Sequence, residues 1–172
     1  MKKVFSLLVV LALALSAVAF AEEAPVAGSP VPLEVVNVSS DAVNVIVDEV
    51  EENEVAKQLL DFVAANDSAD VFGEELGAYE MVEMATLAIS GYEESIGDLT
   101  FTVKFAAAFE QDAKLAVLIG LINAEDLTVA WQPVNFTVEE DGSVTATLTA
   151  EQALAVQNGS AVISVLQEKA AE

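Results

Sequence analysis

The sequence predicts a mainly β protein, an antiparallel sandwich with one N-terminal amphipathic helix and one short helical insertion. Three observations lead to this fold class. Short runs of strand-forming residues recur between turn signals along the chain, and only two segments depart from that pattern toward a helix. Strands do not alternate with helices as they do in parallel sheets, so the strands are expected to pair antiparallel.

The N-terminus has the organisation of a secretory signal. Lys2 and Lys3 form a positive region, residues 4–20 are uncharged and apolar, and small residues flank a cleavage position after Ala21. We therefore expect a signal peptide over residues 1–21 and a Pro-rich linker over 22–33. The alternative is an uncleaved membrane anchor, since the apolar run approaches the length of a spanning helix.

Secretion without disulfides is the expected fate of this chain. It contains no cysteine, which excludes both a disulfide framework and a lipid anchor on a cysteine. This combination favours an exported bacterial protein, extracellular and from a Gram-positive organism. We expect no attachment to the membrane after signal cleavage.

The folded part is expected to be a single β-sandwich domain over residues 34–168. It begins with two Val-rich strands, residues 33–38 and 42–47, around a Ser-Ser-Asp turn. The spacing of Val55, Leu59, Phe62 and Val63 then predicts an amphipathic helix over about 50–66. A loop with two glycines is expected over residues 72–77.

The rest of the chain is mostly predicted as strands. Residues 81–89 are expected to form a strand, with a helix as the alternative because residues 80–85 also suit one. Residues 99–105 alternate strictly between apolar and polar side chains, and 114–122 suit a central strand covered on both faces. Residues 128–132 form a further strand, which Pro133 ends or confines to a sheet edge.

The C-terminal third combines a hairpin, a helix and a last strand. Asp141-Gly142 predicts a hairpin between strands 135–138 and 144–148. Thr149 and Gln152 have the spacing of a capping box, which predicts a short helix over residues 150–157. The last strand is expected over residues 161–166.

Residues 98–166 resemble the immunoglobulin-like β-sandwich domains of secreted and cell-surface proteins from Gram-positive gut bacteria. Five segments match: Leu99-Thr100-Phe101-Thr102-Val103, Leu115-Ala116-Val117-Leu118-Ile119, Trp131 with Pro133-Val134, Asp141-Gly142-Ser143-Val144-Thr145 and Ser160-Ala161-Val162-Ile163. The expected helix before the last strand departs from that pattern. The resemblance implies a spacer or interaction module outside the cell and assigns no catalytic residue.

Composition excludes several kinds of chemistry. The chain has no His and no Cys, so a Ser-His-Asp triad, a catalytic cysteine and a zinc finger are excluded. A formal net charge of −23 opposes binding to the phosphate backbone of nucleic acids. We find no nucleotide-binding or hydrolase motif and expect neither a cofactor nor enzymatic activity.

Two candidate sites remain. Glu139, Glu140 and Asp141 offer oxygen ligands of the kind that calcium prefers, although they lack the alternating spacing of a calcium loop, and diffuse binding of cations is the alternative. Trp131 is a candidate platform for a ligand such as a sugar ring, and a core residue is the alternative. The adjacent acids Glu74-Glu75, Glu93-Glu94 and Glu139-Glu140 are expected to be solvated surface.

These observations leave two hypotheses about function. The first is a non-enzymatic, acidic, secreted module for adhesion, cell-envelope attachment or interaction, with an unidentified protein or glycan at the cell surface as partner. The second is a small carbohydrate-binding or glycan-cleaving protein that uses Trp131 and paired acids.

Overall fold

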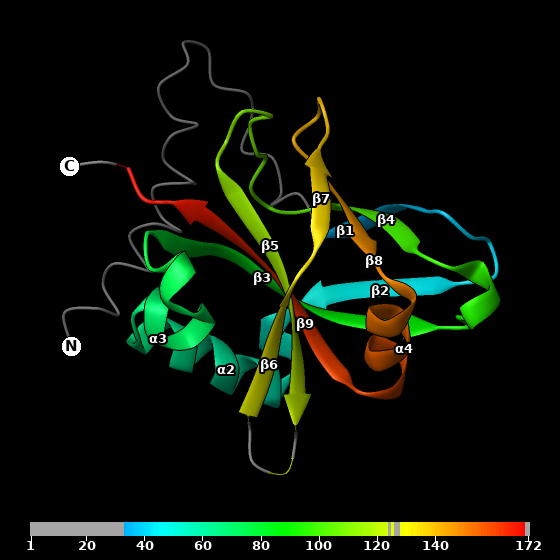
Figure 1. Ribbon diagram of the computed structural model, residues 1–172, viewed down its shortest axis with the longest axis horizontal. Coiled ribbons are helices and arrows are strands. Elements are labelled where there is room, and N and C mark those ends of the chain that lie inside the picture. Colours follow the sequence, from blue (N-terminus) through cyan, green and yellow to red (C-terminus); the bar gives the residue numbers. More distant parts are fainter. Residues whose placement is uncertain (1–32, 124, 126–127, 171–172) are drawn as a thin grey trace.

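The computed structural model describes residues 33–123, 125 and 128–170. In this part of the chain, two antiparallel sheets lie over each other, as Figure 1 shows. The mainly β, two-sheet prediction is therefore confirmed. The predicted signal segment 1–21 and all of the predicted linker except Leu33 lie outside the described residues.

The first sheet has four strands in the order β1-β4-β8-β7. Their bounds are Glu34–Val38 for β1, Leu99–Lys104 for β4, Val144–Leu148 for β8 and Asn135–Val138 for β7. The predicted hairpin is present as β7 and β8, and the positive φ of Gly142 (80°) explains the glycine in its turn. Alternate side chains of β4 and β8 are completely buried and face the second sheet.

The second sheet has five strands in the order β2-β3-β9-β5-β6. Their bounds are Asn44–Glu49 for β2, Tyr79–Ser90 for β3, Ser160–Glu168 for β9, Leu115–Asn123 for β5 and Thr128–Pro133 for β6. β5 is an inner strand buried on both faces, as its apolar run predicts, and β6 is an edge strand that ends at Pro133. The main core fills the space between the two sheets.

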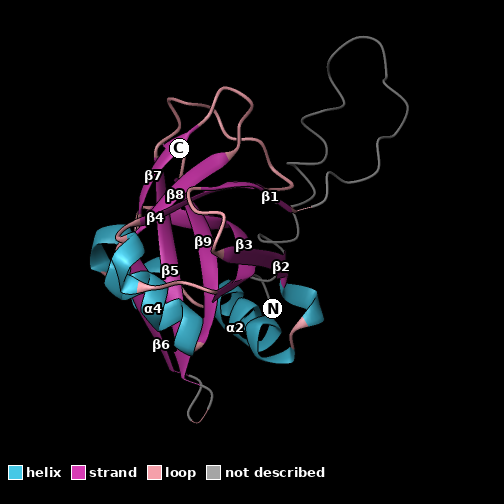
Figure 2. Cartoon of the chain, turned by 90° about the vertical axis from the view of Figure 1, so that its right-hand side faces the viewer, coloured by secondary structure: helices cyan, strands magenta, loops and turns pink. Residues whose placement is uncertain are grey.

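Two helical segments cover different parts of this sheet pair. Helix α2 (Glu54–Ala65) follows a 3-10 turn η2 (Val50–Glu52), and the side chain of Asn53 caps it by accepting hydrogen bonds from the N–H groups of Val55 and Ala56. Helix α4 (Ala150–Asn158) connects β8 to β9 and has both hydrogen bonds of the predicted capping box. Figure 1 shows α2 and α4 at opposite sides of the molecule, and Figure 2 shows all the helices around the lower part of the strands.

Helix α2 packs on the outer face of the five-stranded sheet. Its buried side chains, Ala56, Leu59 and Val63, form a second apolar cluster with outward residues of β3, β5 and β9 such as Met81, Leu118 and Leu166. This sheet is therefore covered on both faces, by the other sheet and by α2. The four-stranded sheet has only one apolar face.

The two predicted N-terminal strands are present as β1 and β2, and they lie in different sheets, β1 in the four-stranded and β2 in the five-stranded one. One local prediction needs correction. The segment after Asn66 is not a plain loop: a helix α3 (Ser68–Phe72) and a 3-10 turn η3 (Glu74–Leu76) occupy it, separated by Gly73 with φ 106°. One turn of helix is too short to display a periodicity, and α3 is held by tertiary contacts.

Candidate functional site

The acidic turn residues lie on the outer side of the four-stranded sheet and form hydrogen bonds within their own hairpin. Glu139 Oε1 accepts hydrogen bonds from the hydroxyls of Thr145 (2.6 Å) and Thr137 (3.3 Å). Asp141 Oδ1 accepts from the hydroxyl of Ser143 (2.6 Å) and from its N–H (3.1 Å). These bonds from Ser143 hold the pKa of the Asp141 carboxyl below its ordinary value.

The three candidate calcium ligands are all exposed. Lys104 Nζ lies 3.8 Å from Asp141 Oδ2, so a cation of the protein already faces this carboxylate. Within the described residues, no three acidic side chains are grouped closely enough to hold a metal ion. A shallow hollow of about 450 Å³ lies beside them, lined by Val36, Asn37, Thr102, Glu139, Asp141, Ser143 and Thr145.

Trp131 lies on the opposite side of the molecule, on the outer face of the five-stranded sheet. It pairs in register with Gly120 of β5, and a Cβ atom at Gly120 would come within 2.6 Å of Trp131 Cζ3. The indole ring therefore lies across the bare backbone of Gly120. Phe72 of α3 meets it edge to face, with ring centroids 4.8 Å apart. Trp131 is half-buried, so its ring packs against neighbouring residues and keeps part of its surface accessible.

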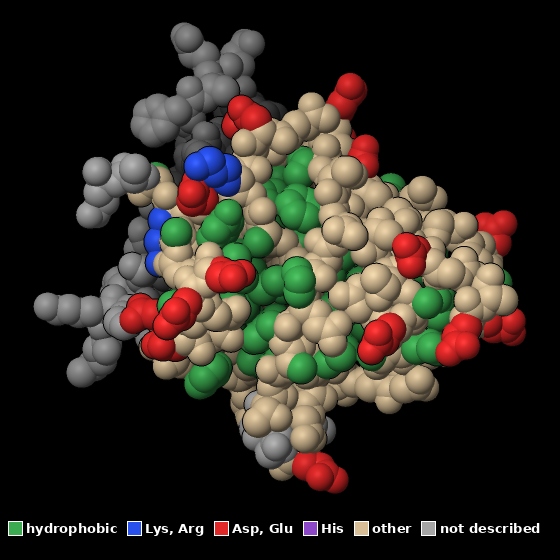
Figure 3. Space-filling view, in the orientation of Figure 1, with side chains coloured by type: hydrophobic (Ala, Val, Ile, Leu, Met, Phe, Trp, Pro, Cys, Tyr) green, Lys and Arg blue, Asp and Glu red, His purple; other side chains and the backbone are tan. Residues whose placement is uncertain are grey.

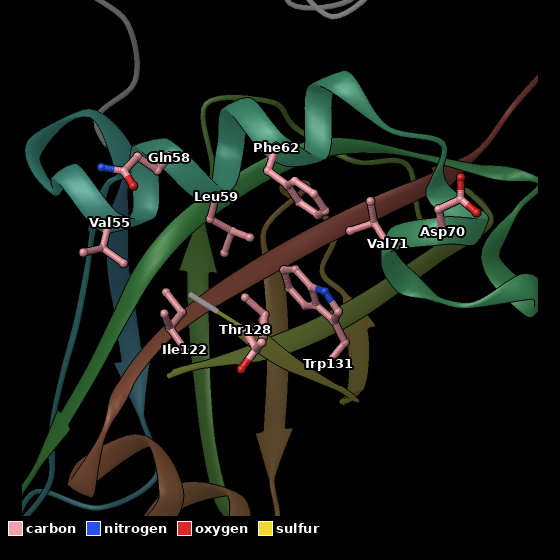
Figure 4. A pocket seen from close by; sticks show the side chains of 10 residues that line it. Val55, Gln58, Leu59, Phe62, Asp70, Val71, Ile122, Thr128 and Trp131 are labelled. Atoms are coloured by element: carbon pink, nitrogen blue, oxygen red, sulfur yellow. The ribbon is translucent and has the colours of Figure 1, made fainter. Parts of the chain in front are cut away.

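An apolar groove of about 460 Å³ opens beside this ring, between helix α2 and the end of the β5–β6 hairpin. Figure 4 shows Leu59 and Phe62 pointing down from α2, and Trp131 rising toward them from β6 with Val71 beside it. The lining residues are Val55, Gln58, Leu59, Phe62, Asp70, Val71, Ile122, Thr128, Val129 and Trp131. We name this hollow the α2–β6 groove.

The groove exists because α2 does not extend over the edge strand. Phe62 follows the buried Leu59 on the same helix face, yet 55% of its surface is exposed. Among the described residues, Gln58, Asp70 and Thr128 are the polar members of the lining. Figure 3 shows hydrophobic side chains gathered in this region of the surface, with Asp and Glu around them. An apolar opening with few polar groups is typical of sites that bind another molecule.

One carboxyl has an environment that the sequence did not indicate. Glu83 is largely buried in β3, beside an irregularity in the pairing of β3 with β9. Its Oε1 accepts a hydrogen bond from the N–H of Ala107 (3.0 Å), and burial raises the pKa of this carboxyl. Glu83 does not line the α2–β6 groove. The adjacent acid pairs expected on the surface are indeed exposed at all three places.

The sequence pointed to Trp131 but missed the other residues that make the groove. Phe62 was assigned to the apolar stripe of α2, and the stripe does include it. Helix α2 carries more apolar side chains on this face than it buries. The exposed one, Phe62, is the only signal in the sequence for a docking surface here. Gly120 gave no signal, because its role depends on the ring opposite.

Comparisons with known proteins give no family: no family model, no curated protein and no solved structure matches this chain. None of the described helices combines the length and the apolar character that crossing a membrane requires.

Proposed function

We propose that this protein is a secreted, non-enzymatic, acidic module that binds a partner outside the cell through the α2–β6 groove. The observation that carries the proposal is the groove itself, an apolar opening of about 460 Å³ bordered by Trp131 and by the exposed Phe62. Water-exposed apolar surface costs free energy, and a partner that covers it recovers that free energy. The export part of the proposal rests on Lys2, Lys3 and the apolar run before Ala21.

The fold part of the proposal is an immunoglobulin-like sandwich over residues 98–166. In that fold, strands A, B, E and D form one sheet, and strand C pairs with strand F in the other. The order β1-β4-β8-β7 and the pairing of β5 with β9 support it, if β4 takes the place of B, β5 of C, β8 of E and β9 of F. The chain departs from the pattern where β3 occupies the place of strand G and where α4 joins β8 to β9.

Photo-crosslinking tests the interaction at the groove. A photoreactive residue placed at position 62 should capture a partner from the extracellular fraction of the native organism. The same residue at position 147, on the outer face of the four-stranded sheet, is the matched control. Capture at position 62 alone supports the proposal, whereas equal capture at both positions, or none at position 62, contradicts it.

Mass spectrometry of the exported protein should find Glu22 as its first residue.

Glycan binding is the second candidate, and the observation that favours it is the half-buried Trp131, which lines the groove together with Asp70. A sugar also needs several polar partners for its hydroxyls, and the groove offers few. Saturable binding on a glycan array that Trp131→Ala abolishes, with an unchanged circular dichroism spectrum, would favour this candidate. Glycan cleavage by paired acids is less supported, because Glu83, whose pKa is raised by burial, lies outside the groove.

A further inference from the structure

The chemistry around the α2–β6 groove identifies the kind of partner it fits, an inference that rests on the proposed function. We propose that the occupant is a polypeptide segment whose apolar side chains are flanked by Lys or Arg. The apolar side chains enter the groove, and the basic ones face the acids Glu54 and Asp61 of α2.

Helix α2 presents a row of apolar side chains to the groove. Val55, Leu59 and Phe62 are spaced four and three residues apart, so they follow one another along one side of α2. Ile122, Val129 and Trp131 form the opposite wall. A segment with apolar side chains at regular spacing can place several of them between these walls.

A row of polar side chains runs beside the apolar row on the same helix. Glu54, Gln58 and Asp61 repeat the spacing of the apolar row one residue earlier, so they form the neighbouring row along α2. Both acids are exposed, and Gln58 also lines the groove. Asp70 of α3 adds a further exposed carboxylate to the groove lining. Lys57, exposed three residues after Glu54 and four before Asp61, offsets one of these charges, so the border of the apolar surface keeps a net negative charge.

The molecule itself could supply two occupants, a second copy of the chain and its own N-terminal segment. A second copy of the chain would bring another formal net charge of −23 toward this border, which opposes self-association. The chain's own segment 22–32 begins with Glu22 and Glu23 and contains no Lys or Arg. Both carry the same sign of charge as the border, so a basic partner is favoured.

The edge of the five-stranded sheet also borders the groove. In the described part of the chain, β6 pairs with β5 alone, so its other side is an open edge next to the groove. An extended polypeptide can pair with such an edge through its backbone while its side chains enter pockets beside it. This favours a polypeptide over a small amphiphilic molecule.

Trp131 supplies the readout, because it is the only tryptophan in the chain. The purified protein is titrated at low salt with four short synthetic peptides of equal length: Leu alternating with Lys, Leu with Glu, Leu with Gln, and Ser with Lys. The Leu-Lys peptide should bind saturably and shift the emission of Trp131 to shorter wavelength as the ring loses contact with water. The Leu-Glu peptide should bind about tenfold more weakly or not at all.

Charge variants separate a site from general attraction. Glu54→Gln combined with Asp61→Asn should weaken binding of the Leu-Lys peptide about fivefold at low salt, and high salt should remove that difference. The matched control, Glu93→Gln combined with Glu151→Gln, makes the same charge change near α4 on the other side of the molecule (Figure 1). An equal loss in the control pair would overturn the acidic border as the recognition element.

The outcomes distinguish the inference from the proposed function. If the Leu-Gln peptide binds as tightly as the Leu-Lys peptide and Phe62→Ala weakens both, the groove is a docking site but its preference for basic segments is wrong. If the Ser-Lys peptide binds as well as the Leu-Lys peptide, charge alone acts and the groove is not the site. If no peptide changes the emission of Trp131, both the inference and peptide docking at the groove are contradicted.

Discussion

The outer faces of the two sheets differ in how they meet solvent. On the four-stranded sheet, paired threonines of β4 and β8 bond across the strands: Thr100 with Thr147 at 3.1 Å, and Thr102 with Thr145 at 2.9 Å between hydroxyl oxygens. These side chains are satisfied locally and need no cover. The outer face of the five-stranded sheet is apolar and must be covered by helices. Helix α2 does not cover β6, where Phe72 of α3 packs against Trp131, and the surface left open between these elements is the α2–β6 groove.

An exposed apolar groove therefore arises on the face that needs helices to cover it, and not on the face of hydrogen-bonded hydroxyls. A face of hydrogen-bonded hydroxyls can end anywhere in solvent at little cost, whereas an apolar face leaves unburied surface wherever its cover is too short. The following predictions test this difference, from the largest expected effect to the smallest.

Truncation along α2 should mark where the cover ends. Leu59→Ala removes a buried side chain from the cluster under the helix and should lower the free energy of unfolding by about 3 kcal/mol. Phe62→Ala, one helical turn further, should cost about 1 kcal/mol or less, because Phe62 is largely exposed. Urea unfolding followed by circular dichroism measures both. Equal losses would mean that the groove is closed in solution.

A side chain at Gly120 should disturb the indole ring opposite. Gly120→Ala places a Cβ within 2.6 Å of Trp131 Cζ3 and 2.8 Å of Val129 Cγ1, so both side chains must move. Such overpacking should cost about 2 kcal/mol and change the emission of Trp131. Ala130→Val, at an exposed position of β6, adds atoms to the same hairpin and should stay within about 0.5 kcal/mol of the parent. An unchanged emission spectrum for Gly120→Ala would contradict the ring placement.

Hydroxyl removal should have opposite signs on the two faces. Ser164 Oγ is buried under α2 and has no hydrogen-bond partner among the described residues, so Ser164→Ala should raise the free energy of unfolding by about 1 kcal/mol. Thr145→Val, on the other face, takes a partner from Glu139 and Thr102 and should lower it by about 1 kcal/mol. Chemical denaturation of both variants tests the contrast, and a shared sign would break it.

The pH dependence of stability should report on Glu83. Burial raises the pKa of its carboxyl in the folded state, so its contribution to stability is fully present below the ordinary pKa and is lost as pH rises through the folded pKa. Glu83→Gln should therefore be more stable than the parent at neutral pH, with a gain that disappears on acidification. The amide oxygen can still accept from the N–H of Ala107.

Glu93→Gln is the control for Glu83→Gln, since it removes one negative charge from an exposed turn. Any relief of general charge repulsion appears in both variants, and only the buried position should add to it. Thermal melting across about pH 3 to 8, from below the ordinary carboxyl pKa of 4.5 to well above it, gives the comparison. A gain at neutral pH that is equal in the two variants would contradict the assignment to burial.

Local patterns in the sequence were sufficient for most elements. Alternation in residues 99–105, the Asp141-Gly142 turn and the Thr149–Gln152 capping box each depend on neighbours within a few residues, and the structure contains all three features. The net charge and the missing His and Cys are likewise properties of the sequence alone. These features are local or additive, so no knowledge of chain packing is needed to predict them.

The groove and the strand pairing were decided only by the tertiary structure. That β1 and β2 lie in different sheets, that Gly120 lies opposite Trp131 and that Phe62 extends beyond the surface α2 covers each depend on residues brought together from distant parts of the chain. A hydrophobic pattern records which side chains avoid water, but it does not record whether enough surface exists to bury them all. In this protein the apolar side chains at the edge strand β6 are left partly unburied, and the proposed function is located there.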